Sequence, residues 1–176
     1  MISLIFSSDM NLGIGKDDKI PWHINSEIRR EDLQFFKQNT IRKIVIMGSK
    51  TWKSLNCKPL KDRINIVVTR DPIEEVSGVI FCDSPESAIA MAKSIPICET
   101  FVIGGASLYN YSFLNGLADQ IIHSQLKNKI FDCDVSVNQE LYLKFINDPN
   151  VTLMNEMITD YFVNRIYVKG ENYGKM

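Results

Sequence analysis

The chain has 176 residues, of which 45% are hydrophobic and 23% charged, and its formal net charge is -1. These values are typical of a soluble globular protein, and the length fits one domain with a substantial core, expected over residues 1–176. The near-neutral charge excludes a general affinity for nucleic acid, which needs a clear basic excess, so we expect small-molecule partners.

The cysteines and the first residues indicate a cytoplasmic protein without a metal site. Cys57, Cys82, Cys98 and Cys133 are scattered and accompanied by only two histidines, whereas metal sites need clustered ligands. The apolar run at residues 1–6 has no basic segment or cleavage site, so it predicts a strand rather than a signal peptide. No apolar run approaches the ~20 residues of a membrane span.

In chain order, short apolar runs alternate with helical patterns. Residues 2–7 predict a buried strand, and the punctuated stretch at residues 8–23 predicts a functional loop that packs on the protein. Asn25 or Ser26 can cap a helix that runs to about Gln38. Further strands are expected at residues 44–47, 64–69, 79–81, 100–103 and 121–126, and further helices at 49–55, 84–93 and 106–115.

The C-terminal part predicts an antiparallel pair, because residues 151–158 and 162–169 alternate in polarity on either side of a short turn. Residues 127–142 give no clear pattern. Strands that alternate with helices indicate an α/β fold. We expect a central, twisted, mostly parallel sheet of about eight strands, with helices on both faces and the antiparallel pair at one edge.

Asp32 is the unusual member of the first predicted helix. At helical spacing its carboxylate points the same way as Ile28, Phe35 and Phe36. Glu27 lies on a charged, solvated face instead. Loss of hydration among aromatic side chains disfavours the charged form of a carboxylate and suits it to exchange protons near neutrality. On spacing alone, an ordinary acidic residue at the helix edge is the simpler interpretation.

Two strand-to-helix junctions have the chemistry of phosphate sites. Gly48 ends one strand, and the amides after it open a helix beside Lys50, where partial positive charge favours a phosphate. Gly104 and Gly105 end another strand and let the backbone approach a ligand closely. Neither junction matches a known phosphate-loop motif. Together they indicate a dinucleotide beyond the carboxyl ends of the strands.

Three other side chains have both a functional and a structural interpretation. Arg70, just past a strand, could bind an extra phosphate or extend into water. Arg63 could pair with a substrate carboxylate, although a surface arginine is the commoner outcome. His23 is a candidate base beside Trp22, but a lone histidine is more often structural, and we expect that nothing nearby orients it.

Together these motifs resemble the dihydrofolate reductase family. The resembling segments are ISLI (2–5), NLGIG (11–15), IPW (20–22), DLxxFKxxT (32–40), VIMGxxTWxS (45–54), PLxxRxN (59–65) and VIGGxxxY (102–109). They follow the order of the family and lie within the first 126 residues, and the ordered set is far more specific than any one segment. The C-terminal part matches weakly, although residues 161–169 look like the family's last strand.

The resemblance implies a monomeric reductase, a target of antifolate-type inhibitors, that uses NADPH to convert dihydrofolate to tetrahydrofolate for one-carbon metabolism and thymidylate synthesis. Hydride would reach C6 while N5 gains a proton. Asp32 would bind the amino group and N3 of the pterin and favour protonation of N5. The loop that carries Ile14, Ile20 and Trp22 would close over the nicotinamide. The implied catalytic residues are Asp32, Trp22 and Ile20.

The other implied site residues come from the matching motifs, with Arg63 on the glutamate carboxylate and Ser124 at the pterin end. Those for the substrate are Ile5, Leu33, Phe36, Lys37, Leu55, Arg63, Ile103 and Ser124. Those for the cofactor are Ser7, Ile14, Gly15, Gly48, Ser49, Lys50, Thr51, Thr69, Arg70, Gly104, Gly105, Ala106, Ser107, Leu108 and Tyr109. The family also carries a cis peptide bond between the glycines that match Gly104 and Gly105.

The sequence departs from the family at four points. Spacing from Trp22 places the acid at Glu27, whereas the motif around Phe36 places it at Asp32 with about five inserted residues. We adopt Asp32, because it stays with its aromatic neighbours. The other departures are Ser49 in place of arginine, Ile20 in place of methionine, and residues 131–134.

Two alternatives remain. One is a riboflavin-pathway reductase on the same fold, which the combination of Asp32, Phe36 and Arg63 disfavours. The other is a binding or structural protein that keeps the fold. Its mark would be a lost acid or broken cofactor loops, and the sequence has neither.

Overall fold

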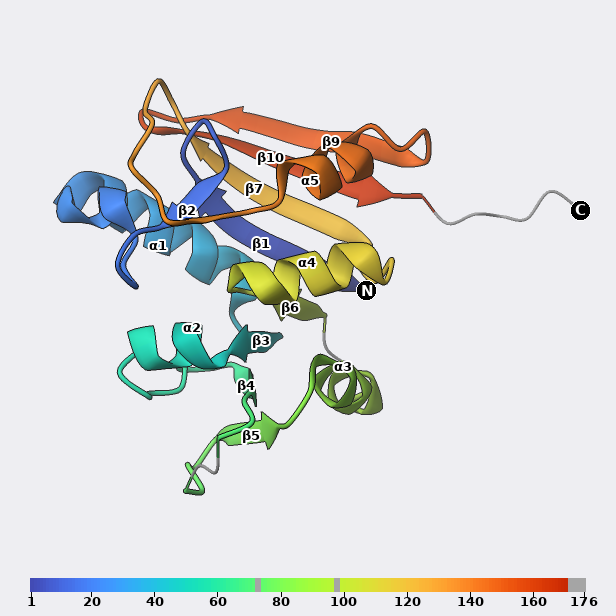
Figure 1. The fold of residues 1–176 in the computed structure, drawn as a ribbon. Coiled ribbons are helices and arrows are strands. Elements are labelled where there is room, and N and C mark those ends of the chain that lie inside the picture. The colour runs from blue at the N-terminus through green and yellow to red at the C-terminus, as the bar shows by residue number, and fades with distance from the viewer. Residues whose placement is uncertain (72–73, 97–98, 171–176) are drawn as a thin grey trace, which may run out of the picture.

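A computed structural model describes residues 1–71, 74–96 and 99–170. Its centre is an eight-stranded sheet in the order β5-β4-β3-β6-β1-β7-β10-β9 (Figure 1). The strands are β1 (Ile2–Ser8), β3 (Ile44–Gly48), β4 (Ile64–Val68), β5 (Val79–Cys82), β6 (Thr100–Val102), β7 (Gln120–Leu126), β9 (Val151–Ile158) and β10 (Phe162–Lys169). Pairs from β5 to β7 are parallel, and β10 is antiparallel to β7 and β9. The predicted mostly parallel sheet with an antiparallel C-terminal edge is confirmed.

Helices cover both faces of this sheet, as predicted (Figure 1). They are α1 (Ser26–Thr40), α2 (Ser49–Ser54), α3 (Pro85–Ser94), α4 (Ala106–Leu114), α5 (Gln139–Ile146) and the 3-10 helix η1 (Pro21–Ile24). A hydrophobic core lies on each face of the sheet. Because alternate residues of a strand point to opposite faces, β1 supplies side chains to both cores. Leu4 and Phe6 pack with side chains of α3, α4 and α5, whereas Ile5 packs with Phe36 of α1 and Trp52 of α2.

Residues 127–142, which gave no pattern, contain β8 (Val135–Ser136) and the start of α5. The loop at residues 8–23 contains β2 (Gly13–Gly15), which pairs with β8 in a separate two-stranded sheet. A strand of two or three residues is too short to show an alternating pattern in the sequence. β2 and β8 are strands only because they pair with each other from distant parts of the chain.

The residues between the two candidate acids form regular helix. Asn25 caps α1, with its side-chain oxygen 3.0 Å from the amides of both Glu27 and Ile28. The helix then runs without interruption through Asp32 to Thr40. The segment where the family motif predicts about five inserted residues is therefore regular helix at the N-terminal end of α1.

His123 on β7 is buried beneath the sheet's helical cover and is 1% exposed. Its Nε2 lies 2.7 Å from Ser8 Oγ, its Nδ1 lies 2.8 Å from the Tyr142 hydroxyl, and its ring packs 4.7 Å from that of Phe6. Burial, with a smaller contribution from Arg165, lowers the pKa of His123 to about 3. The ring is therefore neutral in the folded protein near neutral pH.

We expect this histidine to make the fold sensitive to acid. An unfolded histidine titrates near 6.5, so the stabilising contribution is complete above that pH and is lost as pH falls toward about 3. Between pH 7 and pH 5 the loss should be about 2 kcal/mol in the free energy of unfolding. Urea unfolding at both pH values should show this loss in the native chain and in Tyr142→Phe, which keeps the ring buried, but not in His123→Asn. Equal losses in all three proteins would contradict the prediction.

Candidate functional site

The carboxylate of Asp32 lies where β1, η1 and α1 meet, and the residue is 7% exposed. Its Oδ2 accepts hydrogen bonds from Ser7 Oγ at 3.0 Å, Trp22 Nε1 at 3.0 Å and His23 Nε2 at 2.7 Å. An ionised carboxylate only accepts hydrogen bonds, so the imidazole nitrogen is the donor in the last of these. The acid is therefore held by polar donors in addition to its expected apolar neighbours.

His23 is a site residue that the sequence argument set aside. The expectation that nothing nearby orients it is wrong, because its ring nitrogen bonds directly to Asp32. The two residues are nine positions apart, and the turn from η1 into α1 brings them together. Ser7, expected at the cofactor, also directs its hydroxyl to this acid.

Glu27 and Glu31 point away from the site. The hydroxyl of Tyr161 donates a hydrogen bond to the Glu27 carboxylate, and the hydroxyl of Thr159 donates one to that of Glu31. Both partners belong to the turn between β9 and β10. Of the two candidate acids, Asp32 is thus the one that the other predicted site residues surround.

Apolar residues expected at the substrate gather on the same face of the sheet as Asp32. Ile5, Phe36, Leu55 and Ile103 pack into one cluster. On α1, Leu33 and Lys37 are exposed and lie outside this cluster. Ser124 on β7 is buried and lies directly opposite Ser7 on β1.

Arg63 is a fixed side chain rather than a free surface arginine. Its Nε donates to Thr40 Oγ1 at 2.9 Å, and its Nη1 donates to the Lys61 carbonyl at 2.9 Å. Its guanidinium carbon lies 5.7 Å from the centre of the Phe36 ring, within the range of a cation–π contact. Burial lowers the pKa of Arg63, an effect that Asp62 opposes. The guanidinium is therefore held beside the aromatic cluster that adjoins the acid.

The two glycine junctions meet at the carboxyl ends of β3 and β6. The Gly48 amide donates to the Gly104 carbonyl at 2.8 Å, and the peptide between Gly104 and Gly105 is cis, as the resemblance implies. Gly104 has φ +120°, and a Cβ there would lie 3.3 Å from both Thr51 Oγ1 and the Tyr109 hydroxyl. This position therefore requires glycine. Tyr109 itself is buried and donates to the Ile5 carbonyl at 2.8 Å.

A cavity of about 350 Å³ adjoins these junctions. It is lined by Gly48, Ser49, Val68, Thr69, Arg70, Asp71, Asp83, Pro85, Ser107 and Leu108. The cavity thus joins predicted cofactor residues from three strand ends. Lys50 is exposed beside it, whereas Ile14 and Gly15 lie apart on β2. Asp71 and Asp83 are lining residues that the sequence argument missed, because no motif marks them.

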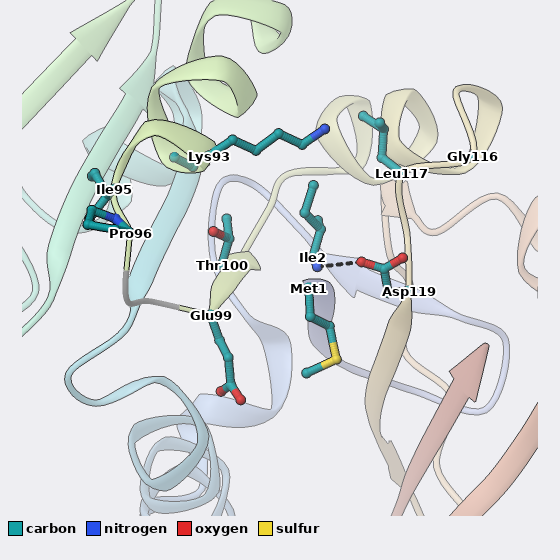
Figure 2. A pocket seen from close by; sticks show the side chains of 11 residues that line it. Met1, Ile2, Lys93, Ile95, Pro96, Glu99, Thr100, Gly116, Leu117 and Asp119 are labelled. Atoms are coloured by element: carbon teal, nitrogen blue, oxygen red, sulfur yellow. Dashed lines mark hydrogen bonds between the residues drawn. The ribbon is translucent and has the colours of Figure 1, made fainter. Parts of the chain in front are cut away.

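A larger cavity of about 620 Å³ lies at the amino ends of the parallel strands, where β1, β6 and β7 begin (Figure 2). Its lining includes Lys93, Glu99 and Asp119, and the Asp119 carboxylate accepts the Ile2 amide at 2.8 Å. None of the predicted site residues contributes to it. In parallel α/β sheets ligands bind at the carboxyl ends of the strands, so the candidate site remains at the Asp32 side.

Asp9 fastens the base of the loop that carries Ile14, Ile20 and Trp22. It is 1% exposed, and its Oδ1 accepts the amides of Asn11 at 2.9 Å and Gly13 at 2.8 Å. Its Oδ2 accepts the Phe131 amide at 2.8 Å. One carboxylate thus joins the 8–23 loop to the segment that precedes β8. The sequence signal for this role was an Asp two residues before Asn11, a spacing that is typical of a turn closed by an Asp side chain.

Within the described ranges, no group of three or more His, Cys, Asp or Glu side chains is placed to hold a metal ion. Cys57, Cys82 and Cys133 are free thiols, and Cys98 lies outside the described residues. No helix in the described part of the chain is long and apolar enough to cross a membrane.

Comparison with known proteins gives a consistent result. A family model described as dihydrofolate reductase matches residues 1–150. The dihydrofolate reductase of Buchnera aphidicola is 44% identical over 108 residues, which are 61% of this chain and 62% of that relative. The match therefore spans less than two thirds of that relative. The Haemophilus influenzae dihydrofolate reductase is 38% identical over 128 residues, 73% of each chain. The structure of Enterococcus faecalis dihydrofolate reductase complexed with NADP(H) and RAB-propyl superposes with a TM-score of 0.78 at 25% identity, covering 97% of both chains.

The Asp9 contacts generate a prediction about local stability. Asp9→Ala removes the acceptor of three amides, of which that of Gly13 is buried, and leaving a buried amide unpaired costs about 1–3 kcal/mol. We expect hydrogen exchange at the amides of Gly13 and Phe131 to accelerate at least about tenfold. Lys19→Ala, at an exposed position of the same loop, should leave both rates unchanged. Unaltered exchange in Asp9→Ala, measured by NMR, would contradict this role.

Proposed function

The chain belongs to the dihydrofolate reductase family, and from this premise we propose that it reduces 7,8-dihydrofolate to 5,6,7,8-tetrahydrofolate with NADPH, as a single cytoplasmic domain that supports one-carbon metabolism and thymidylate synthesis. The observation that carries the proposal is the buried Asp32, bonded to Trp22 and adjoining the apolar cluster of Ile5 and Phe36. The eight-stranded sheet places β1, from the start of the chain, between the later strands β6 and β7, which supports one domain. Free thiols fit a reducing compartment.

The residues at the glycine junctions fit the phosphates of a dinucleotide. Gly104 occupies a position that no side chain can fill, and the N-terminus of α4 after Gly105 has no side-chain cap, which leaves backbone amides to bind an anion. Ser49, Thr69 and Arg70 line the adjoining cavity and would hold the adenosine end. NADPH, when bound there, supplies the hydride.

The acid and its neighbours fit a pterin attached to a carboxylate tail. Asp32 would bind the amino group and N3 of the pterin and favour a proton at N5. Ile5, Phe36, Leu55 and Ile103 would form the apolar wall and exclude water. Arg63, already held over Phe36, would bind the tail carboxylate. This combination of an acid, an apolar wall and a fixed arginine favours dihydrofolate over a ribosylaminopyrimidine.

The first test is loss of nicotinamide absorbance with purified protein, NADPH and dihydrofolate. We expect turnover by the native chain and a fall of about 10²–10⁴-fold in Asp32→Asn near neutral pH, since a positioned acid contributes about that factor. Glu27→Gln is the matched control, because this carboxylate is exposed and bonded to Tyr161. Collapse in Glu27→Gln instead would move the acid to that position. An inactive native chain that still binds NADPH would favour the binding-protein alternative.

Arg70 gives a prediction about cofactor choice. Arg70 lines the cavity at the end of β4, and its guanidinium would bind the extra phosphate that distinguishes NADPH from NADH. Hydrogen bonds to a charged group contribute about 1.5–3 kcal/mol, so Arg70→Ala should lower the ratio of kcat/KM for NADPH to that for NADH by about 10–100-fold. Arg30→Ala, on the exposed face of α1, should leave the ratio unchanged. A ratio insensitive to Arg70→Ala would place the phosphate elsewhere.

A further inference from the structure

The hydrogen bonds of Asp32 are distributed unevenly between its two oxygens. Ser7, Trp22 and His23 all donate to Oδ2, at 3.0, 3.0 and 2.7 Å. Among residues 1–71, 74–96 and 99–170, no donor is bonded to Oδ1. A carboxylate oxygen has about two lone-pair sites, so three donors exceed what Oδ2 accepts in good geometry. One oxygen is therefore free for a ligand, and the other is over-supplied.

The three donors differ in how firmly they are held. Trp22 is 1% exposed and packs with Ile28 in a buried cluster, and Ser7 lies within the central strand β1. His23 lies on the four-residue helix η1, and 18% of its side chain is exposed. It is thus the donor that can turn toward solvent without disturbing a core.

A ligand that offers two adjacent N–H groups, such as a pterin through its amino group and N3, needs both oxygens of the carboxylate. Resting on the dihydrofolate reductase function proposed above, we propose that His23 is a displaceable donor. It bonds to Asp32 Oδ2 in the ligand-free site and yields this bond to the incoming ring. The His23 side chain therefore lowers the affinity of the site for ligands that hydrogen-bond to both oxygens of Asp32. It acts on the ligand through Asp32.

The test measures the Kd of dihydrofolate and of a 2,4-diaminopyrimidine antifolate with the full chain. His23→Ala should tighten both by about two- to tenfold, the factor that one net hydrogen bond represents. His23→Gln, whose amide reaches a similar distance and still donates, should bind as the native chain does. In an Asp32→Asn background His23→Ala should change neither Kd. Weaker or unchanged binding in His23→Ala overturns the proposal.

A second measurement does not depend on turnover. The imidazole nitrogen signals of His23 in the ligand-free, ¹⁵N-histidine-labelled protein should shift in Asp32→Asn, while those of His123 should not. Signals of His23 that do not respond to Asp32→Asn overturn the proposal. A native chain that fails to reduce dihydrofolate, but whose His23 signals respond to Asp32→Asn and to the antifolate, would overturn the proposed activity and leave the displaceable donor supported.

Discussion

A carboxylate removed from water must be bonded to donors, and the site is arranged around that requirement. Asp32 faces inward among the apolar side chains of α1, where an unpaired charge would be costly. The donors come from two places in the chain: the central strand β1 through Ser7, and η1, at the end of the 8–23 loop, through Trp22 and His23. The need to satisfy one acid therefore fixes how the 8–23 loop meets the first helix.

The need of Asp32 for hydrogen-bond donors also explains why β1 takes part in the site. Its residues alternate between two cores, so Leu4 and Phe6 join α3, α4 and α5, whereas Ile5 joins the cluster on the side of α1. Ser7 continues that alternation and arrives beside Asp32. A strand buried on both faces has few positions for polar side chains. In β1 one of these positions holds Ser7, which donates a hydrogen bond to Asp32.

Much of the fold could be predicted from the sequence because each long element has its own periodicity. The parallel strands, α1 and the closing pair β9 and β10 are visible as apolar runs or alternation. Asp32 was predicted as the acid by combining spacing with a family resemblance, and the structure buries its carboxylate beside predicted site residues. The contact between His23 and Asp32 and the hydrogen bonds of Asp9 could not be predicted from the sequence, since both depend on how turns fold back in space. The short strands β2 and β8 could not be predicted either, because only their pairing with each other defines them.

The N-terminal part of α1 is linked to the far end of the chain. This part of the helix carries Glu27 and Glu31, which accept hydrogen bonds from Tyr161 and Thr159 in the turn between β9 and β10. The hairpin of β9 and β10 therefore supports the helix that carries Asp32. This hairpin lies C-terminal to every residue that is predicted to contact a ligand. In this protein the last hairpin is part of the scaffold of the site, and substitutions in its turn would act on the orientation of α1 from outside the pocket.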